Sequence, residues 1–470
     1  MSWLKNFPKQ KPKKRGFEGG SRGRRTKHWR PGGGDAAAQI RPALPILRER
    51  SRDLRRNNSH AKKGVELITN NVIGKGIKTI IQNDPTPNKQ NEKDWKEWTE
   101  SALFDFEERS NLFGLQGILM DAVVESGEVM ARRRITDSKF PISYQILESD
   151  FLNDSQLDGI QEGGNLILQG IEFDSNGRRI GYHLHSTHPG GVNASLANFT
   201  SSSNLIPAQE VYHLFRQERP GQVRGVPWLA PVMIRLRDFS DFEDAVLMRQ
   251  KVSALFVAFV RDLSAECVND DEESEELGER MTPAMIEHLP PGKDVEFANP
   301  PDPTNYKEFT SQQLKSVAAG LGVSYEALTG DLSEVNFSSA RMGWIEMGRN
   351  IDAWREKIII QNFLKKVEQD FILMQSLRGI PTDGMTFTHV SPKREMIDPA
   401  KEFGASIKAI RAGLSSRTEE IAALGKDVKD VDERIKKDND SIDSNEFIFD
   451  TDPRKTNQAG GLQVGAPIEE

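Results

Sequence analysis

Cysteine is nearly absent from this sequence, because Cys267 is the only one among 470 residues. A single cysteine excludes an intrachain disulfide and is typical of proteins in a reducing compartment. Acidic residues lie beside Cys267, and negative charge disfavours the thiolate on which cysteine chemistry depends. The thiol is therefore not a candidate nucleophile.

Long apolar runs are also missing. No stretch approaches the roughly 18 apolar residues of a transmembrane helix, and the basic N-terminus lacks the apolar segment of a signal peptide. Hydrophobic residues make up 36% of the chain, fewer than in most globular proteins. We expect a cytoplasmic product with no membrane partner and much exposed surface, as in an elongated subunit of an oligomer.

Motifs of the common nucleotide-binding and metal-dependent enzymes are lacking. The sequence contains no G-x-x-x-x-G-K-[ST] phosphate loop and no H-E-x-x-H helix, and Gly74-Lys75-Gly76 is too short to cradle a phosphate. We predict that the chain is not an enzyme and holds no cofactor, so that any ATP hydrolysis comes from a partner.

Three histidines suggest a metal site as an alternative. His183, His185 and His188 form H-x-H-x-x-H, and the first two would share one face of a strand. No carboxylate pattern completes the set, and Pro189-Gly190-Gly191 indicates a loop. We favour exposed strand histidines and predict no metal.

Charge is unevenly distributed. The net charge is −7, yet residues 1–30 carry eleven Lys and Arg against one acidic residue, Glu18. A basic arm on an acidic body predicts a disordered, solvated tail. The alternative is a nucleic-acid-binding protein that acts through residues 5–30, with affinity that depends strongly on salt.

The first half of the chain mixes helical and strand patterns. Two helices are predicted over 43–72 with a break near Asn57-Asn58, then one that Asp94 caps and that carries Leu103, and one that Gly127 ends. Short strands follow over 129–135, 143–147, 166–173, 180–185 and 210–215. The run Asp174-Ser175-Asn176-Gly177 is typical of a hairpin turn. The composition of residues 187–204 predicts a mobile loop.

The second half is mainly helical. A long helix over 228–260 leaves the body, an acidic and proline-rich excursion follows, and a helix over 306–321 returns. Such a pair of helices builds a stalk. A second long helix is predicted over 339–377, and shorter helices over 396–435.

Four stretches together carry a family resemblance. They are RDLRRNN (52–58) with NNVIGKGI (70–77), HLFR (213–216) with ERPGQVRGVPWL (218–229), the segment from GLGVSYE (320–326) through TGD (329–331) to NFSSAR (336–341), and IDPAKE (397–402). Over residues 40–435 the chain resembles the lambda-type portal proteins of tailed bacteriophages.

The resemblance implies an α+β portal fold in a ring oligomer, with an α/β wing, a two-helix stem, a small clip and a helical crown. Its divisions would be a basic disordered arm (1–38), the wing (39–227), a stem helix (228–260), the clip (261–305), a returning stem helix (306–321), a tunnel-loop region (322–338), wing and crown helices (339–440) and a disordered tail (441–470).

The resemblance also implies a function and partners. About twelve subunits would surround a channel at one capsid vertex, through which double-stranded DNA is packaged and ejected. The terminase large subunit would dock on the ring, with the major capsid protein, the scaffold and the head–tail adaptor as further partners. The protein would belong to the virion and pass through the host cytoplasm during assembly. The alternative remains a phage structural protein that binds nucleic acid through its basic arm.

Two motif regions supply candidate channel or inter-subunit residues. From the first come Arg219, Gln222, Arg224 and Trp228, and from the tunnel-loop region come Asp331, Asn336, Ser338 and Arg341. For the first group the alternative is a buried turn that fixes the stem helix. For Asp331, Asn336 and Ser338 it is helix capping and turn hydrogen bonding.

Overall fold

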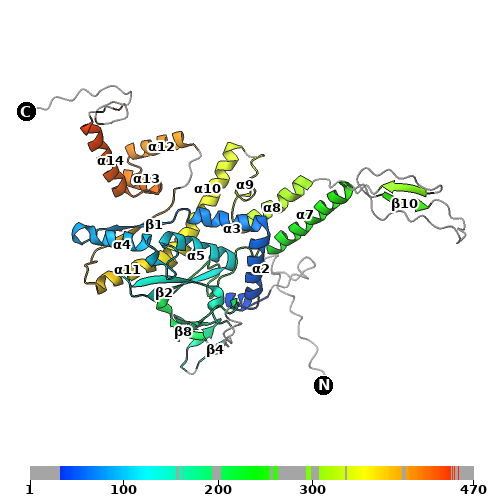
Figure 1. Cartoon of the computed structure of the whole chain (residues 1–470), viewed down its shortest axis with the longest axis horizontal. Coiled ribbons are helices and arrows are strands. Elements are labelled where there is room, and N and C mark those ends of the chain that lie inside the picture. The colour runs from blue at the N-terminus through cyan, green and yellow to red at the C-terminus, as the bar shows by residue number, and fades with distance from the viewer. Residues whose placement is uncertain are drawn as a thin grey trace, which may run out of the picture.

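The computed structural model describes residues 32–154, 158–161, 163–192, 203–254, 258–262, 293–297, 306–333, 336–393, 398–445, 447, 449 and 454. Most of the predicted basic arm, the acidic run after Cys267 and most of the predicted tail lie outside these residues. The described chain has a central α/β body, with the helices α7 and α8 projecting from one side and α12 to α14 gathered at the opposite end (Figure 1).

The N-terminal helices follow the sequence prediction closely. After the short α1 (Ala36–Ile40), α2 (Leu44–Asn57) and α3 (Ser59–Val72) meet at Asn58. Asn58 has an extended backbone, and its side chain accepts a hydrogen bond from the Ala61 amide at 2.8 Å. This cap confirms the predicted break. The helix α1 begins inside the segment predicted as a disordered arm, which corrects that boundary.

The helix α4 (Gln90–Glu100) begins before its predicted cap. Asp84 accepts from the Glu92 amide at 3.0 Å, and the Thr86 hydroxyl accepts from the Gln90 amide at 2.8 Å. These two side chains accept hydrogen bonds from backbone amides of the first turn and so take the capping role predicted for Asp94. Asp94 lies inside the helix, where it is buried. Leu103 lies in the following 3-10 turn η4 (Ala102–Phe104), not in α4.

The helix α5 (Leu112–Ser126) ends as predicted. Gly127 adopts φ 90° and its amide donates to the Val123 carbonyl at 3.0 Å. This left-handed position favours glycine and turns the chain directly into β2.

Two antiparallel sheets form the β part of the body. The first has the order β3-β2-β9, from β2 (Glu128–Ile135), β3 (Ile142–Glu148) and β9 (Val211–Phe215). The second has the order β4-β5-β6-β7-β8, from β4 (Gly159–Ile160), β5 (Leu166–Leu168), β6 (Ile171–Phe173), β7 (Arg179–His185) and β8 (Ser203–Pro207).

The strand predicted over 166–173 is in fact two strands. Gln169 and Gly170 have φ of 51° and 79°, so the chain reverses between β5 and β6. The predicted turn at 174–177 is confirmed, because it joins the paired strands β6 and β7 with Gly177 at φ 79°. Residues 193–202 of the predicted loop lie outside the described residues, and β8 begins at Ser203.

Two further strand pairs join distant segments. The strand β1 (Lys78–Gln82) pairs with β12 (Thr386–Val390), and β10 (Ala258–Asp262) pairs with β11 (Lys293–Phe297). The first pair was not predicted, because its stability depends on a partner about 300 residues away and not on local pattern.

The main core lies where α3, α4, α5, the first sheet and the later helices meet. Aromatic rings fill it, with Trp98 and Phe104 4.9 Å apart and Tyr144 and Phe363 5.6 Å apart between ring centroids. Asp370 is buried among them, accepting from Tyr144 at 2.7 Å and from Tyr212, and pairing with Arg133 at 2.6 Å. The two phenols and the guanidinium satisfy the buried carboxylate.

The projecting helices are α7 (Met233–Ala254) and α8 (Tyr306–Leu321). The helix predicted over 228–260 is therefore too long at both ends. Pro227 and Pro231 keep residues 228–232 in turns, and 258–262 pair as a strand. The helix α8 matches its prediction. The two pack together through Phe242 and Phe309, whose rings are 4.8 Å apart.

The remaining helices run from the body to the far end of the chain. After the short α9 (Tyr325–Thr329), α10 (Phe337–Trp354) continues into a π-helix, η7 (Arg355–Leu364), and then α11 (Lys365–Leu377). The prediction of one long helix over 339–377 missed this π segment. The helices α12 (Pro399–Arg411), α13 (Arg417–Ala423) and α14 (Val428–Ser444) complete the fold, and α14 enters the predicted tail. None of the described helices is long and apolar enough to cross a bilayer.

A glycine substitution tests the contact between the end of α5 and the chain before α7. A Cβ at Gly225 would lie 2.1 Å from the Gly127 carbonyl oxygen, whereas a Cβ at Gly117 in α5 would meet nothing within 4 Å. We expect Gly225→Ala to lower the free energy of unfolding by about 1–3 kcal/mol through overpacking. Gly117→Ala should raise it by about 0.5–1 kcal/mol through helix propensity. Denaturant unfolding of both variants measures the difference, and equal stabilities would contradict the close approach.

Candidate functional site

Gln222 braces the turn that precedes α7. Its side-chain oxygen accepts from the amides of Glu218 at 2.8 Å and Arg219 at 3.3 Å, and its amide nitrogen donates to the carbonyl of Arg224 at 2.9 Å. The side chain is buried. Gln222 therefore holds its own loop, as the buried-turn interpretation predicts, and is not exposed on this chain.

Arg224 is buried in an ion pair with Glu128 at the start of β2. Its Nε donates to Glu128 Oε1 at 2.8 Å, while the Gly225 amide donates to Glu128 Oε2 at 2.8 Å. His213 Nε2 lies 3.0 Å from the same Oε2. One carboxylate thus ties together β2, β9 and the segment before α7.

The environment of this cluster determines the protonation states of Glu128 and His213. Burial alone would disfavour the carboxylate, but Arg224 and then His213 hold the pKa of Glu128 well below its usual range. Burial lowers the pKa of His213, so its ring is neutral near pH 7. The pair is a structural tie with its charge matched internally.

Trp228 and Arg219 complete the first group of candidates. Trp228 is buried, with its ring 4.8 Å from that of Trp354 and under the Arg216 guanidinium at 4.7 Å. Arg219 is exposed and donates to Gln39 at 2.8 Å. Of the four predicted residues, Arg219 alone lies on the surface of the chain, because the other three hold the base of α7.

The second group lies around α9. Ser324 caps that helix, and Gly330 ends it with φ 76°. Asp331 accepts from the Ser333 amide at 3.0 Å and the Ser333 hydroxyl at 2.7 Å. These hydrogen bonds hold the pKa of the Asp331 carboxyl below its ordinary value. The turn-forming interpretation of Asp331 is therefore confirmed.

The other three residues of this group lie at or near the start of α10. Asn336 and Arg341 are exposed at the start of α10, and the side chain of Ser338 lies outside the described residues. The structure brings none of them to the Glu128 cluster. Their role toward a channel or a neighbouring subunit stays a prediction.

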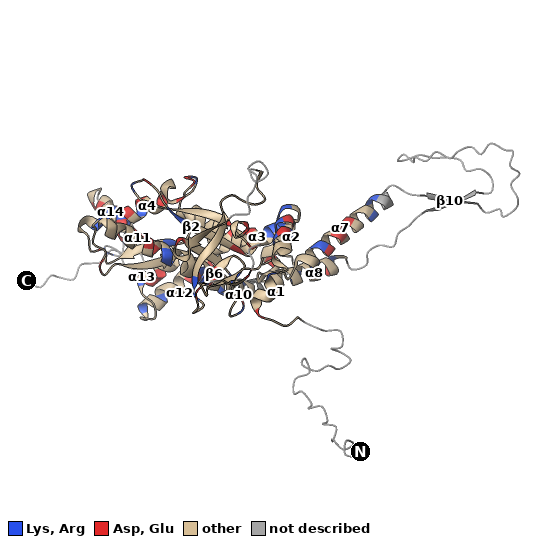
Figure 2. Ribbon diagram, turned by 90° about the horizontal axis from the view of Figure 1, so that it is seen from below, with Lys and Arg blue, Asp and Glu red and all other residues tan. Residues whose placement is uncertain are grey.

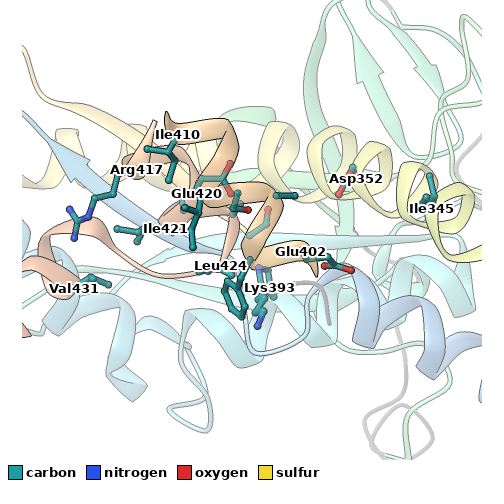
Figure 3. Close-up of a pocket in the computed structure, with 18 of the residues that line it drawn as sticks. Ile345, Asp352, Lys393, Glu402, Ile410, Arg417, Glu420, Ile421, Leu424 and Val431 are labelled. Carbon is teal, nitrogen blue, oxygen red and sulfur yellow. The ribbon is translucent and has the colours of Figure 1, made fainter. Parts of the chain in front are cut away.

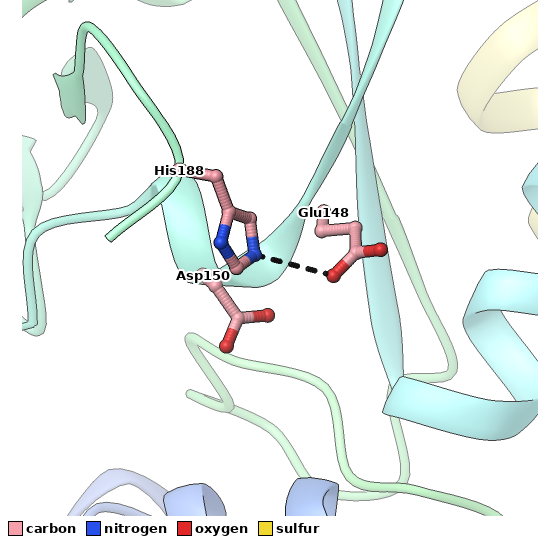
Figure 4. A group of neighbouring side chains, drawn as sticks. All are labelled: Glu148, Asp150 and His188. Carbon is pink, nitrogen blue, oxygen red and sulfur yellow. Dashed lines mark ion pairs between the residues drawn. The ribbon is translucent and has the colours of Figure 1, made fainter. Parts of the chain in front are cut away.

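The three histidines do not converge in the described part of the chain. His183 Nε2 lies 3.2 Å from Glu172 Oε2, whereas His188 lies beside Glu148 and Asp150 (Figure 4). The ligand atoms of that second group lie within 4.8 Å of one another. However, Arg52 donates to Glu148 at 2.9 Å and to Asp150 at 2.6 Å, so a guanidinium already matches the carboxylates.

An apolar groove lies between α10 and the helices α12 to α14 (Figure 3). Its volume is about 930 Å³, and its apolar lining includes Ile345, Ile410, Ile421, Leu424 and Val431. None of α12, α13 and α14 contains a buried residue. Sequence reasoning missed this groove, although the apolar stripe Phe403, Ile407 and Ile410 on α12 was visible as i, i+4, i+7 spacing.

Removing the charge of Glu128 tests the buried tie. Glu128→Gln leaves Arg224 buried without a counter-charge, so we expect a loss of about 3–5 kcal/mol in unfolding free energy near pH 7. The folded pKa is depressed, so this contribution is present above the unfolded pKa and is lost as pH falls toward the folded pKa. The difference from the unsubstituted chain should therefore stay constant above about pH 5 and narrow progressively as the pH falls below the ordinary carboxyl pKa of 4.5.

Glu97→Gln is the matched control, because Glu97 forms an exposed pair with Lys139 and should contribute less than about 1 kcal/mol. Equal losses in the two variants, measured by denaturant unfolding, would contradict the role of the Glu128 tie.

Comparison with known proteins places these features in a family. The model of the family described as "Phage portal protein, lambda family" matches residues 22–355. A probable portal protein of Halomonas phage phiHAP-1 is 28% identical over 437 residues, covering 87% of this chain and 83% of that protein. Portal protein B of Escherichia phage lambda is 22% identical, covering 88% of each chain.

Solved structures show weaker likeness. The neck of an empty GTA particle gives a TM-score of 0.44 at 14% identity, covering 84% of this chain and 94% of that one. An HK97 family portal protein from Corynebacterium diphtheriae gives 0.34 at 10% identity, covering 79% and 99%. These scores decide nothing about function. The family match spans the buried Glu128–Arg224 tie, the helices α7 and α8 and the α9 turn, and by that match the chain belongs to the lambda family of phage portal proteins.

Proposed function

We propose that copies of this chain form a ring of about twelve subunits at one capsid vertex, through which double-stranded DNA is packaged and ejected. The observation that carries the proposal is the family match over residues 22–355, together with portal-protein relatives of which this chain covers 83% and 88%. The lambda family is one of structural proteins, and we infer that this chain catalyses no reaction. The terminase large subunit would supply the ATP-driven motor.

In this proposal α7 and α8 are the stem, and the excursion between them is the clip. The pair projects from the body, with β10 and β11 beyond it, which suits a docking platform for the terminase and later for the head–tail adaptor (Figure 1). Figure 2 shows Lys and Arg mixed with Asp and Glu along α7. A surface of mixed sign suits a DNA channel, because a uniformly basic wall would hold the phosphates and slow translocation.

The segment 322–338 is proposed as the tunnel-loop region, with Asn336 and Arg341 toward the channel or the next subunit. Residues 39–227 would form the wing, and the helices after 339 the wing and crown. The wing would meet the major capsid protein and the scaffold during assembly in the host cytoplasm, and the mature ring would stay in the virion.

A neighbouring copy is the proposed occupant of the groove between α10 and α12 to α14. The groove leaves apolar side chains half exposed, including Phe403 at 44% and Ile407 at 52%. Its rim carries both signs of charge, with Arg341 and Arg417 against Glu402 and Glu420. A second copy of the same chain offers complementary charges of both signs, and a closed ring would cover this surface on every subunit.

A substitution in the groove tests the ring. We expect Ile407→Asp to abolish rings in negative-stain class averages, because a carboxylate would be buried at the interface without a partner. Ile135→Asp is the matched control, since Ile135 is 86% exposed at the end of β2 and does not belong to the groove lining. Circular dichroism should show both variants folded. Rings formed by Ile407→Asp would rule out the groove as the interface.

Deleting residues 1–31 separates the ring from the alternative function. The portal proposal predicts that rings form without the arm. Nucleic-acid binding through the arm predicts that affinity for duplex DNA falls steeply with salt and is lost on deletion. Filter binding at increasing salt, beside class averages of the truncated chain, measures both. A truncated chain that forms no ring, with or without scaffold, would count against the portal proposal.

A further inference from the structure

A second cavity lies on the body, between β7, β9 and the π-helix η7. Its volume is about 580 Å³. Among the described residues, no carboxylate lines it, and four cationic side chains do: Arg179, Arg216, Lys357 and Lys366. This cationic recess is separate from the apolar groove between α10 and α12 to α14 and from the Glu148 cluster.

The cations of the recess are poorly compensated from within. Arg179 donates to the Tyr182 hydroxyl and the Val223 carbonyl, each at 3.3 Å, and not to a carboxylate. Arg216 pairs with Glu218, which is exposed and outside the lining. Within the described residues, neither Lys357 nor Lys366 makes an ion pair.

The pKa of Lys366 reflects this shortage of negative charge. Burial and then the nearby Arg179 lower its pKa, and Asp370 opposes them only in part. Asp370 is already bound to Arg133 and the two phenols Tyr144 and Tyr212. Like charges gathered in a concave, partly buried site are costly unless an anion joins them.

The wall of the recess has an uncommon backbone. The π-helix η7 extends over Arg355–Leu364, and Asn362 donates across its wide turn to the Lys357 carbonyl at 2.7 Å. The π-helix is rare, and π segments within α-helices are frequently found at functional sites. Here the wide turn brings Lys357, Asn362 and Lys366 to the same cavity.

Apolar and aromatic side chains also line the recess. Phe215, Trp354 and Ile358 belong to its lining, beside the buried Tyr182 and His213. Such a lining accepts an apolar side chain and lowers the local dielectric, which strengthens attraction between the cations and a bound anion. A ligand of mixed chemistry fits both parts.

We propose that this cationic recess binds an acidic peptide segment, in which two or more Asp or Glu residues flank an apolar side chain. The apolar side chain packs against Trp354, and the carboxylates meet Arg179, Lys357 and Lys366. A DNA duplex does not fit the same description, because it is a wide rod that presents phosphates on a convex surface and cannot enter a cavity of about 580 Å³. The proposal concerns a single chain and does not depend on the ring.

Titration of the full-length chain with a short peptide tests the site. The probe is an acetylated, amidated peptide with one phenylalanine between two pairs of glutamates, and the readout is tryptophan fluorescence together with calorimetry. We expect saturable one-to-one binding that weakens as salt is raised, since the contacts are between charges. A peptide with glutamines in place of the glutamates should bind at least tenfold more weakly.

Charge reversal identifies the residues. The double variant Lys357→Glu and Lys366→Glu should weaken peptide binding at least tenfold, and the milder Lys357→Gln should weaken it by a smaller factor. Lys365→Glu is the matched control, because Lys365 is exposed on the same helix and outside the recess lining. It should change the dissociation constant by less than twofold, and unfolding curves should show all variants folded.

Three results would overturn the proposal. The first is no binding of the glutamate peptide at millimolar concentration. The second is peptide binding that the double charge reversal leaves unchanged. The third is binding of pyrophosphate or a 20-base-pair duplex at the same residues with higher affinity than the peptide, which would assign the recess to phosphate and not to an acidic segment.

Discussion

The buried carboxylate of Glu128 is the constraint on which much of this structure depends. It lies at the first residue of β2, directly after the glycine that ends α5, and binds Arg224, the Gly225 amide and His213. A charge in the interior is stable only when its partners are fixed in place. The end of α5, the start of the first sheet, β9 and the chain before α7 are therefore held in one arrangement.

That arrangement sets the base of the projecting helices. Gly225 approaches the Gly127 carbonyl too closely for any side chain, and Trp228 follows it into a contact with Trp354 at the end of α10. The backbone of Trp228 donates to the Val124 carbonyl at 3.0 Å. The direction in which α7 leaves the body is thus set by contacts with α5 and α10, which is what a rigid stem in the proposed ring requires.

The apolar groove and the cationic recess differ in chemistry, and the difference suits different partners. The groove at α12 to α14 is apolar with a rim of both signs, as expected of a surface that another copy covers. The cationic recess lies on the sheet side of the body, has one sign of charge and is walled by the π-helix. A subunit with both can contact identical neighbours through one surface and an acidic partner through the other.

Local sequence was sufficient wherever a feature depends on neighbouring residues. It determined the break at Asn58, the end of α5 at Gly127, the hairpin at 174–177 and the limits of α8, because caps and turns are formed by side chains a few residues apart. The motif stretches also determined the family. The hydrogen-bonding role of Asp331 followed from its place in a turn.

Only the tertiary structure decided the features that join distant segments. The pairing of β1 with β12, the burial of Asp94 inside α4 and the tie between Glu128 and Arg224 have no local pattern, since each partner lies far along the chain. For Gln222, Arg224 and Trp228 the sequence left open whether they contact a channel or a neighbouring subunit or form a buried turn, and the structure shows all three buried. The π-helix η7 and the cationic recess beside it were likewise not predicted from the sequence, since the recess joins β7, β9 and η7.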